Sequence, residues 1–189
     1  AMAGFDAAHM SFAGPAKSVG ELEAAIRAGV GAISLESIRE IDACAAIAKR
    51  IGVRAKVSLR VNPLLPNRAF GMKMGGKAVQ FGVDEEELPA AERRITDQID
   101  WLDFRGINVY VGSQCFDPHG ITEAAQNALR IAREVEQRSR LHCAKINLGG
   151  GFGVSHGEER RELDLEALSP LLIPILKSYH KQSSLPCEL

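Results

Sequence analysis

The sequence predicts an α/β protein in which short strands alternate with helices. Three observations predict it: apolar stripes with helical spacing, short apolar runs between those stripes, and no linker or break in composition along 189 residues. Alternating strands and helices form βαβ units, whose strands pair in a parallel sheet. Because His9-Met10 is a common cloning junction, residues 1–10 are expected to derive in part from cloning, and the fold is predicted for residues 11–189.

The helix boundaries carry clear local signals. Ser18 and Glu21 have the spacing of a capping box, in which the serine caps the helix and the glutamate reaches back to the cap. Ser37 and Glu40 repeat that spacing, and Gly52 stands where a left-handed residue is expected to end the second helix. The apolar stripes lie within Val19–Val30, Ile38–Ile51, Leu88–Ile99, Ile121–Val135 and Leu165–Leu176. Two prolines inside the last stripe are expected to interrupt it.

Strand-like runs lie between the predicted helices. They are Ala32–Glu36, Ala55–Val61, Gly106–Val111 and Ala144–Leu148, with the edges of two more strands near Phe12-Ala13 and Pro186–Leu189. The runs alternate in polarity, so that Arg60, Tyr110 and Asn147 lie on polar faces. A sheet covered by helices on both sides is almost continuously apolar, whereas a barrel with a ligand in its lumen alternates. Alternation alone leaves two interpretations open, a barrel lumen holding these three side chains and a partly exposed sheet.

Glycines follow two of the predicted strands and suggest an anion site. Gly149, Gly150 and Gly151 follow one strand directly, and glycine lets backbone N–H groups approach an anion closely. Gly112 and Ser113 end another strand, where the serine hydroxyl adds a donor. Taken alone, the triple glycine is equally consistent with a tight turn. Two such strand ends at one rim of a barrel would converge on a single anion.

Composition excludes several classes of function. A formal net charge of −1 argues against general electrostatic binding of nucleic acid or anionic lipid, and no run of 18 uncharged apolar residues is present to span a membrane. The four cysteines form no CxxC pair and the five histidines show no HxxxH or HExxH spacing, so no metal site is predicted. The cysteines are expected to be free thiols in a reducing cytoplasm.

Four motifs, taken in order, carry a resemblance to a known family. They are Phe12–Ser18, Leu59–Pro63, Gly112–Gln114 and Asn147–Gly153. Together they resemble the fold-type III pyridoxal-phosphate decarboxylases, the ornithine and diaminopimelate decarboxylase group. Residues 71–76 and 81–82 resemble the branch associated with exosortase systems and carrier-protein-bound substrates. The resemblance implies a partial (β/α)8 TIM barrel of the alanine racemase-like type over residues 11–189, with five or six of the eight strands present and the C-terminal β-domain absent.

The resemblance also implies roles for individual residues around pyridoxal 5'-phosphate. Gly149, Gly150 and Gly151 would hold the phosphate together with Ser113. Arg60 would line the cofactor pocket, and Tyr110 would stack on the cofactor ring where the family commonly has a histidine. Glu188 would face the pyridine nitrogen. The alternative for Glu188, a frayed and solvated terminus, stays open.

For function, the resemblance implies that the parent protein is a pyridoxal-phosphate-dependent decarboxylase, a carbon–carbon lyase acting on a small amino acid. Its branch implies a carrier-linked substrate. The family's cofactor-binding lysine belongs upstream of Phe12, where no matching strand is present, and Lys17 is part of a different motif. The chain is therefore expected to be an internal fragment, inactive alone, whose open sheet edges favour a homo-oligomer. Two alternatives remain: a noncatalytic phosphate-binding or assembly module, and a racemase-like or cofactor-carrier relative.

Overall fold

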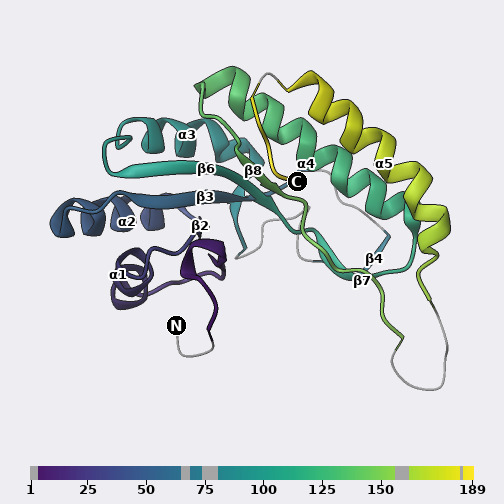
Figure 1. Ribbon diagram of the computed structural model, residues 1–189, viewed down its shortest axis with the longest axis horizontal. Coiled ribbons are helices and arrows are strands. Elements are labelled where there is room, and N and C mark those ends of the chain that lie inside the picture. Colours follow the sequence, from purple (N-terminus) through teal and green to yellow (C-terminus); the bar gives the residue numbers. More distant parts are fainter. Residues whose placement is uncertain (1–3, 65–68, 74–80, 156–161, 184) are drawn as a thin grey trace.

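A curled, parallel sheet with helices packed along its outer side forms the framework of the protein (Figure 1). The computed structural model describes residues 4–64, 69–73, 81–155, 162–183 and 185–189. The sheet strands, in spatial order, are β1 (Ser11–Phe12), β2 (Ala32–Leu35), β3 (Ala55–Asn62), β6 (Leu102–Val109) and β8 (Lys145–Asn147), and β5 (Val83–Asp84) pairs with the end of β3. Every pairing within this sheet is parallel. The predicted partial barrel is confirmed as a curled half-barrel.

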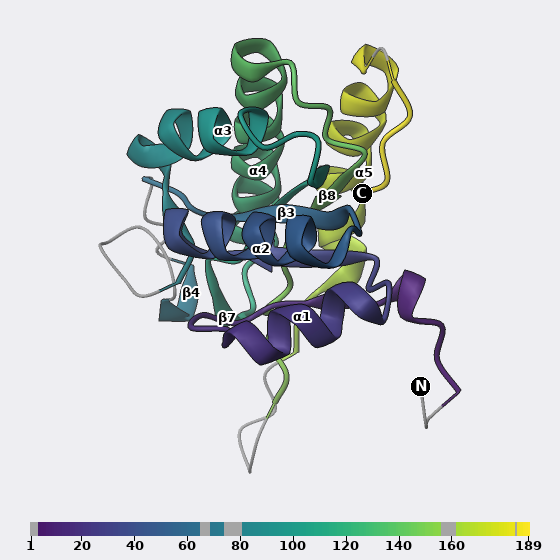
Figure 2. The same ribbon diagram turned by 90° about the vertical axis from the view of Figure 1, so that its left-hand side faces the viewer.

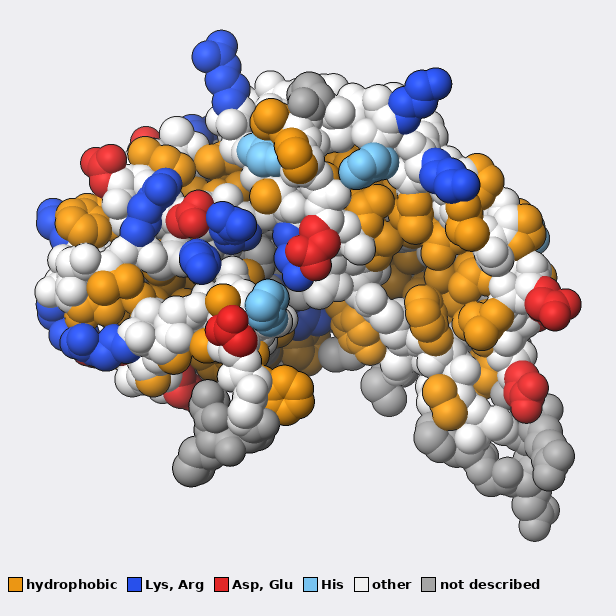
Figure 3. All heavy atoms as spheres, viewed as in Figure 1, with side chains coloured by type: hydrophobic (Ala, Val, Ile, Leu, Met, Phe, Trp, Pro, Cys, Tyr) orange, Lys and Arg blue, Asp and Glu red, His pale blue; other side chains and the backbone are white. Residues whose placement is uncertain are grey.

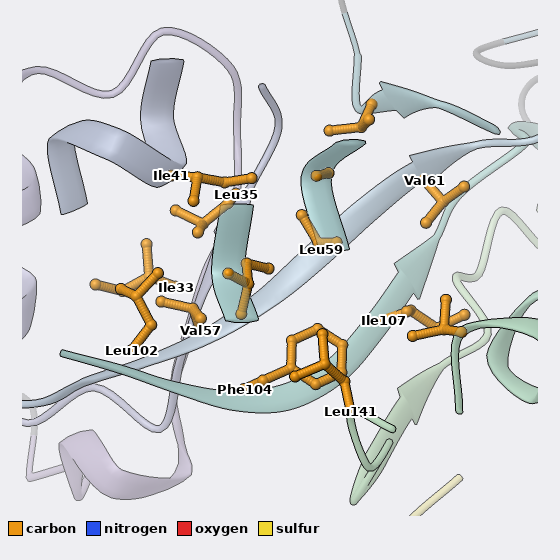
Figure 4. Packing of buried hydrophobic residues seen from close by; sticks show 14 of the residues in the cluster. Ile33, Leu35, Ile41, Val57, Leu59, Val61, Leu102, Phe104, Ile107 and Leu141 are labelled. Atoms are coloured by element: carbon orange, nitrogen blue, oxygen red, sulfur yellow. The ribbon is translucent and has the colours of Figure 1, made fainter. Parts of the chain in front are cut away.

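The helices follow the predicted stripes and cover one face of the sheet (Figure 2). They are α1 (Val19–Arg27), α2 (Ile38–Ile51), α3 (Leu88–Thr96), α4 (Pro118–Ser139) and α5 (Leu165–Gln182), with 3-10 turns at Ala7–His9 and Glu85–Glu87. Under them, the apolar residues of β2, β3 and β6 are buried. Ile33, Leu35, Val57, Leu59 and Ile107 belong to this core (Figure 4). The face that alternation predicts to be apolar therefore contacts the helices.

The opposite face of the sheet is polar and bounds a cavity of about 350 Å³. Its lining includes Ser34, Ser58, Asn108, Lys145 and Asn147, which come from four parallel strands. Residues at one level of a parallel sheet share a face, and the register places Asn108 beside Asn147 on the neighbouring strand. Of the three side chains that the lumen interpretation placed together, Asn147 lines this cavity, whereas Arg60 and Tyr110 are not among its lining residues.

Two strands that the sequence did not predict form a separate antiparallel ribbon. β4 (Phe70–Lys73) pairs with β7 (Gly112–Cys115), outside the main sheet. β7 begins only three residues after the end of β6, so in the sequence its residues look like a loop that follows β6. Another difference is the start of β6, which begins at Leu102 rather than at Gly106, because Leu102 and Phe104 are buried before the glycine interrupts the apolar pattern. Residues 74–76 of the branch motif lie outside the described residues.

The first predicted capping box is complete, and the second is only half formed. Ser18 accepts a hydrogen bond from the N–H of Glu21, whose carboxylate accepts from the N–H of Ser18 at 2.8 Å. Ser37 likewise accepts from the N–H of Glu40, but the Glu40 carboxylate turns away and accepts from the N–H of Glu36 at 2.9 Å. It also pairs with a buried lysine described below, which explains why the reciprocal bond is missing.

Helix α5 runs unbroken through Pro170 and Pro174, so the expectation that these prolines interrupt it is wrong. Both prolines are exposed and stand four residues apart on one face of the helix, where water can solvate the carbonyl groups that lose their N–H partners. Apolar side chains gather over this part of the surface (Figure 3), and the exposed ones of α5 include Leu165 and Ile173. Among the described residues, no helix is both long enough and apolar enough to cross a membrane.

We predict that Gly106→Ala destabilises the fold far more than Gly52→Ala. Both glycines have positive φ, +140° and +69°, but a Cβ at Gly106 would lie 1.8 Å from the carbonyl oxygen of Lys145, whereas one at Gly52 meets nothing within 4 Å. Gly52→Ala should cost about 1 kcal/mol of unfolding free energy from the left-handed backbone alone, and Gly106→Ala about 3 kcal/mol or more. Urea denaturation measures both. Equal losses would contradict the close backbone contact between β6 and β8.

We also predict that one thiol reacts first with a thiol reagent in the native protein at pH 8. Burial raises the pKa of Cys44 to about 12 and also raises the pKa values of Cys143 and Cys187. Since the thiolate is the nucleophile, a raised pKa lowers reactivity at pH 8. Cys187 is only half-buried, whereas Cys44, Cys115 and Cys143 are buried, so Cys187 should react first and all four should react in urea. Mass spectrometry of the labelled peptides checks the order.

Candidate functional site

The turn that follows β8 lies directly against β7. The glycine turn (Gly149–Gly153) donates and accepts backbone hydrogen bonds with β7, and the N–H of Cys115 reaches the carbonyl oxygen of Gly151 at 2.9 Å. A Cβ at Gly151 would lie 1.9 Å from the carbonyl oxygen of Gly112 and 3.0 Å from the Cα of Ser113. Only glycine permits this approach. The two glycine-containing segments of the sequence thus converge at one edge of the half-barrel.

Two backbone N–H groups of the glycine turn have no acceptor among the described residues. Gly149 and Gly151 adopt positive φ values of +81° and +79°. The N–H of Gly149 donates to the side-chain oxygen of Asn147 at 2.9 Å, whereas the N–H groups of Gly150 and Gly151 have no acceptor among the described residues. A Cβ at Gly150 would meet nothing within 4 Å there. Adjacent amides without an internal acceptor can form a nest of the kind that binds anions.

Ser113 stands on β7 beside this nest, followed by a residue in an uncommon conformation. Ser113 is half-buried, and Gln114 has a φ of +58°, in the left-handed region that residues other than glycine rarely adopt. The side-chain oxygen of Gln114 accepts from the N–H of Val154 at 3.1 Å. This bond ties β7 to the segment that leaves the glycine turn, so both sides of the nest are held together by backbone and side chain.

Tyr110 and Arg60 lie next to each other beside the nest. A Cβ at Gly149 would come within 3.3 Å of the Cδ2 atom of the Tyr110 ring, so the turn touches the tyrosine. The guanidinium carbon of Arg60 lies 5.8 Å from the centre of that ring and 5.0 Å from the centre of the Phe81 ring. The structure thus brings together neighbours that sequence analysis selected, because the glycine turn, Ser113, Tyr110 and Arg60 form one continuous site.

A carboxylate that sequence analysis missed faces Arg60. Glu36 follows β2, and both of its carboxylate oxygens lie 3.3 Å from Nη1 of Arg60. One of these oxygens also accepts from the N–H of Gly14 at 2.8 Å. The side chains are almost completely buried, with exposed fractions of 2% for Glu36 and 9% for Arg60. The available sequence signal was an acidic residue at the end of an apolar strand next to a strand that carries an arginine.

Lys17 is buried in a second ion pair and does not point to the nest. Its side chain is 2% exposed, and Nζ donates to a carboxylate oxygen of Glu40 at 3.1 Å and to the carbonyl oxygen of Gly14. The backbone N–H of Lys17 donates to the other oxygen of Glu40 at 3.2 Å. The lysine therefore serves as the counter-charge of Glu40.

Glu188 is held to the edge of the sheet but its side chain is exposed. Its N–H donates to the carbonyl oxygen of Ala144 and its carbonyl oxygen accepts from the N–H of Ile146, both at 2.8 Å. The segment is therefore paired with β8 as a neighbouring parallel strand. The carboxylate is 68% exposed and pairs with Nζ of Lys145 at 2.7 Å, on the wall of the polar cavity. Among the described residues, no group of three or more His, Cys, Asp or Glu side chains is arranged to hold a metal ion.

Comparison with known proteins identifies the family. Residues 1–187 match the model of the pyridoxal-binding domain of the pyridoxal-dependent decarboxylases. The chain is 36% identical over 166 residues to L-glutamyl-(BtrI acyl-carrier protein) decarboxylase of Niallia circulans, covering 86% of the chain and 38% of that protein. It is 35% identical over 158 residues to diaminopimelate decarboxylase of Neisseria meningitidis serogroup A, covering 83% of the chain and 38% of that enzyme. The chain thus spans less than half the length of these relatives.

A solved structure supports the fold as well. Diaminopimelate decarboxylase from Helicobacter pylori, in complex with L-lysine, superposes with a TM-score of 0.83 at 26% identity. The superposition covers 99% of this chain and 46% of that one. The half-barrel therefore corresponds to part of a longer fold in this relative.

We predict that the glycine turn tolerates alanine at one position and not at the next. Gly151→Ala would drive a Cβ into the carbonyl oxygen of Gly112, so it should separate the turn from β7 and cost about 2–4 kcal/mol of unfolding free energy. Gly150→Ala, its matched control, should change stability by less than about 1 kcal/mol, because its Cβ meets open space. Urea denaturation and hydrogen exchange at the N–H of Cys115 measure the two effects. Similar losses in both variants would contradict the described contact.

Proposed function

The chain belongs to the pyridoxal-dependent decarboxylases, and we propose that it forms the phosphate-binding half-barrel of an enzyme that removes the α-carboxylate of an amino acid. The observation that supports this proposal is the contact between the glycine turn and β7, which places Gly150 and Gly151, whose N–H groups have no acceptor among the described residues, next to Ser113. The ring of Tyr110 lies against the same turn, and the buried guanidinium of Arg60 lies 5.8 Å from the centre of that ring. This combination suits a phosphorylated aromatic ligand.

The donor set fits the phosphate of pyridoxal 5'-phosphate. The N–H groups of Gly150 and Gly151 and the hydroxyl of Ser113 would bind the phosphate oxygens. The surroundings of Gly150 support this assignment, because a Cβ at that position would not contact any described protein atom within 4 Å. Contact within the protein therefore does not explain the glycine. When bound, pyridoxal phosphate supplies an electron sink that accepts the electron pair left behind by the departing carboxylate.

Three side chains would act on the ring end of the site. Arg60 lines the pocket and carries a fixed positive charge. Tyr110 offers a ring face for stacking, but it lacks an imidazole that could move a proton near pH 7, in contrast to the histidine of the family pattern. Glu188 would hold a proton at the ring nitrogen, because an anionic partner favours the protonated form of a pyridine. Nζ of Lys145 donates to the Glu188 carboxylate on the cavity wall.

A carrier-protein-linked amino acid is the narrower substrate that we propose. The support is the 36% identity to a relative whose name specifies a glutamyl group on an acyl-carrier protein. We further propose that the protein acts in the cytoplasm, where free thiols persist, and that exposed sheet edges favour a homo-oligomer. The chain alone is not expected to turn over substrate, since Lys17, the lysine within the first motif, is engaged with Glu40.

We predict that the chain binds pyridoxal phosphate and that Gly150→Ala weakens this binding at least tenfold. The added methyl group would occupy the space that the phosphate needs while leaving the fold intact. Gly20→Ala is the matched control, because Gly20 also has open space around its Cβ position but lies on α1, away from the turn. Absorbance titration gives both dissociation constants.

Borohydride reduction of the mixture then tests the covalent step. We expect no reduced adduct on Lys17. No binding by the parent chain would overturn the cofactor assignment and favour the noncatalytic assembly module. Equal affinities of the Gly150→Ala variant and the parent would place the phosphate elsewhere.

A further inference from the structure

We infer that Glu36 is a positioning residue of the site: its buried carboxylate fixes the guanidinium of Arg60 against the ring of Tyr110 and so sets the orientation of that ring. The inference rests on the proposed function, because Tyr110 matters most if it stacks on a bound cofactor. It assigns a task to a residue that the sequence motifs leave unexplained. Four features of the structure support it.

The Glu36–Arg60 pair is buried. Nη1 of Arg60 reaches both oxygens of Glu36, and the N–H of Gly14 supplies a further donor to the carboxylate. Removing two charges from water is costly, and apolar residues of similar volume often stabilise a core better than a buried ion pair does. Stability alone is therefore a weak explanation for the pair, whereas fixed geometry is a direct consequence of it.

The guanidinium of Arg60 is held beside two aromatic rings. It lies within 6 Å of the centres of two rings, those of Tyr110 and Phe81, which is the range of a cation–π contact. The backbone at Gly149 bounds Tyr110 from another direction, because even a Cβ there would come within 3.3 Å of the ring. The ring is confined between the guanidinium and the glycine turn. If the guanidinium moves, one of these two boundaries is lost.

The buried charges around this pair have their own partners. Glu40 accepts hydrogen bonds from Nζ of Lys17 and from the backbone N–H of Glu36. The two buried cations thus have separate partners, Lys17 with Glu40 and Arg60 with Glu36. Because Glu40 is already engaged, it is poorly placed to replace Glu36 as the partner of Arg60. Neutralising Glu36 would leave a buried guanidinium without its counter-charge.

Another buried glutamate, Glu92, allows a matched comparison within the same chain. Glu92 is also buried, and it binds Arg138 through two hydrogen bonds of 2.9 and 2.6 Å between α3 and α4. It resembles Glu36 in chemistry and burial but has no contact with the site. Any general effect of neutralising a buried carboxylate that binds an arginine should appear in both Glu36→Gln and Glu92→Gln, and any effect on the ring should appear only in the first.

The test is NMR of protein carrying ¹³C-labelled tyrosine rings, which gives signals from two residues, Tyr110 and Tyr179. We expect Glu36→Gln to shift the Tyr110 signals and to leave those of Tyr179 in place. Glu92→Gln should lower the urea midpoint but leave the Tyr110 signals in place. Unchanged Tyr110 signals in a folded Glu36→Gln variant would overturn the inference, and so would equal shifts in both variants.

Binding of pyridoxal phosphate supplies a second, independent measurement. We expect Glu36→Gln to raise the dissociation constant about tenfold in the parent chain, and to have no further effect in an Arg60→Lys background, because Glu36 acts through Arg60. Additive losses would overturn the positioning role. If Glu36→Gln does not fold, Glu36→Asp replaces it, since the shorter side chain keeps the charge and withdraws it from Arg60, and the same Tyr110 shift is expected.

The two hypotheses fail separately. Absence of pyridoxal phosphate binding by the parent chain would reject the proposed function, while the tyrosine signals of the free protein would still decide whether Glu36 holds Arg60 against Tyr110.

Discussion

The site depends on the contact between the glycine turn and β7. A carbonyl oxygen of Gly112 occupies the position where a side chain at Gly151 would begin, so the two backbones touch directly. This contact brings the backbone of Ser113 on one strand end beside Gly151 in the turn that follows another, although the two segments are separated by a long helix in the sequence. Donors from different strands can then converge on one ligand without any movement of the fold, which lowers the entropic cost of binding.

Behind this contact, the mouth of the half-barrel holds a set of buried charges that is unusual for a core. Glu36 and Glu40 follow β2, Arg60 comes from β3, and Lys17 comes from the loop before α1. These charges lie beyond the apolar layer that stabilises the sheet, at the end of the strands where parallel barrels place their sites. The fold thus separates two tasks, since apolar packing between sheet and helices supports a rigid rim of polar groups.

Most of the framework was predictable because local periodicity reports burial. The alternation at the start of Ala55–Val61 and the capping signal at Ser18 depend only on neighbours in sequence, and both appear in the structure, although Arg60 on the polar face is buried as well. The ribbon of β4 and β7 was not predictable, since it depends on pairing between distant segments. Glu36 was missed for the same reason: an acidic residue acquires a role only when a strand from elsewhere places an arginine beside it. Pro170 misled because local rules ignore which face of the helix is solvated.

Two of the ion pairs described above, Glu188–Lys145 and Glu36–Arg60, differ in the freedom that they leave to their carboxylates. Glu188 and Lys145 are both largely exposed, and exposed pairs of this kind contribute about 0–1 kcal/mol, so that carboxylate can exchange its lysine for a ligand at little cost. Glu36 is enclosed, and its charge cannot leave Arg60 without exposing a buried guanidinium to apolar surroundings. A fixed charge suits the task of orienting a neighbouring ring, whereas an exposed carboxylate can change its partner. The half-barrel therefore holds the Glu36 carboxylate rigidly and leaves the Glu188 carboxylate adaptable.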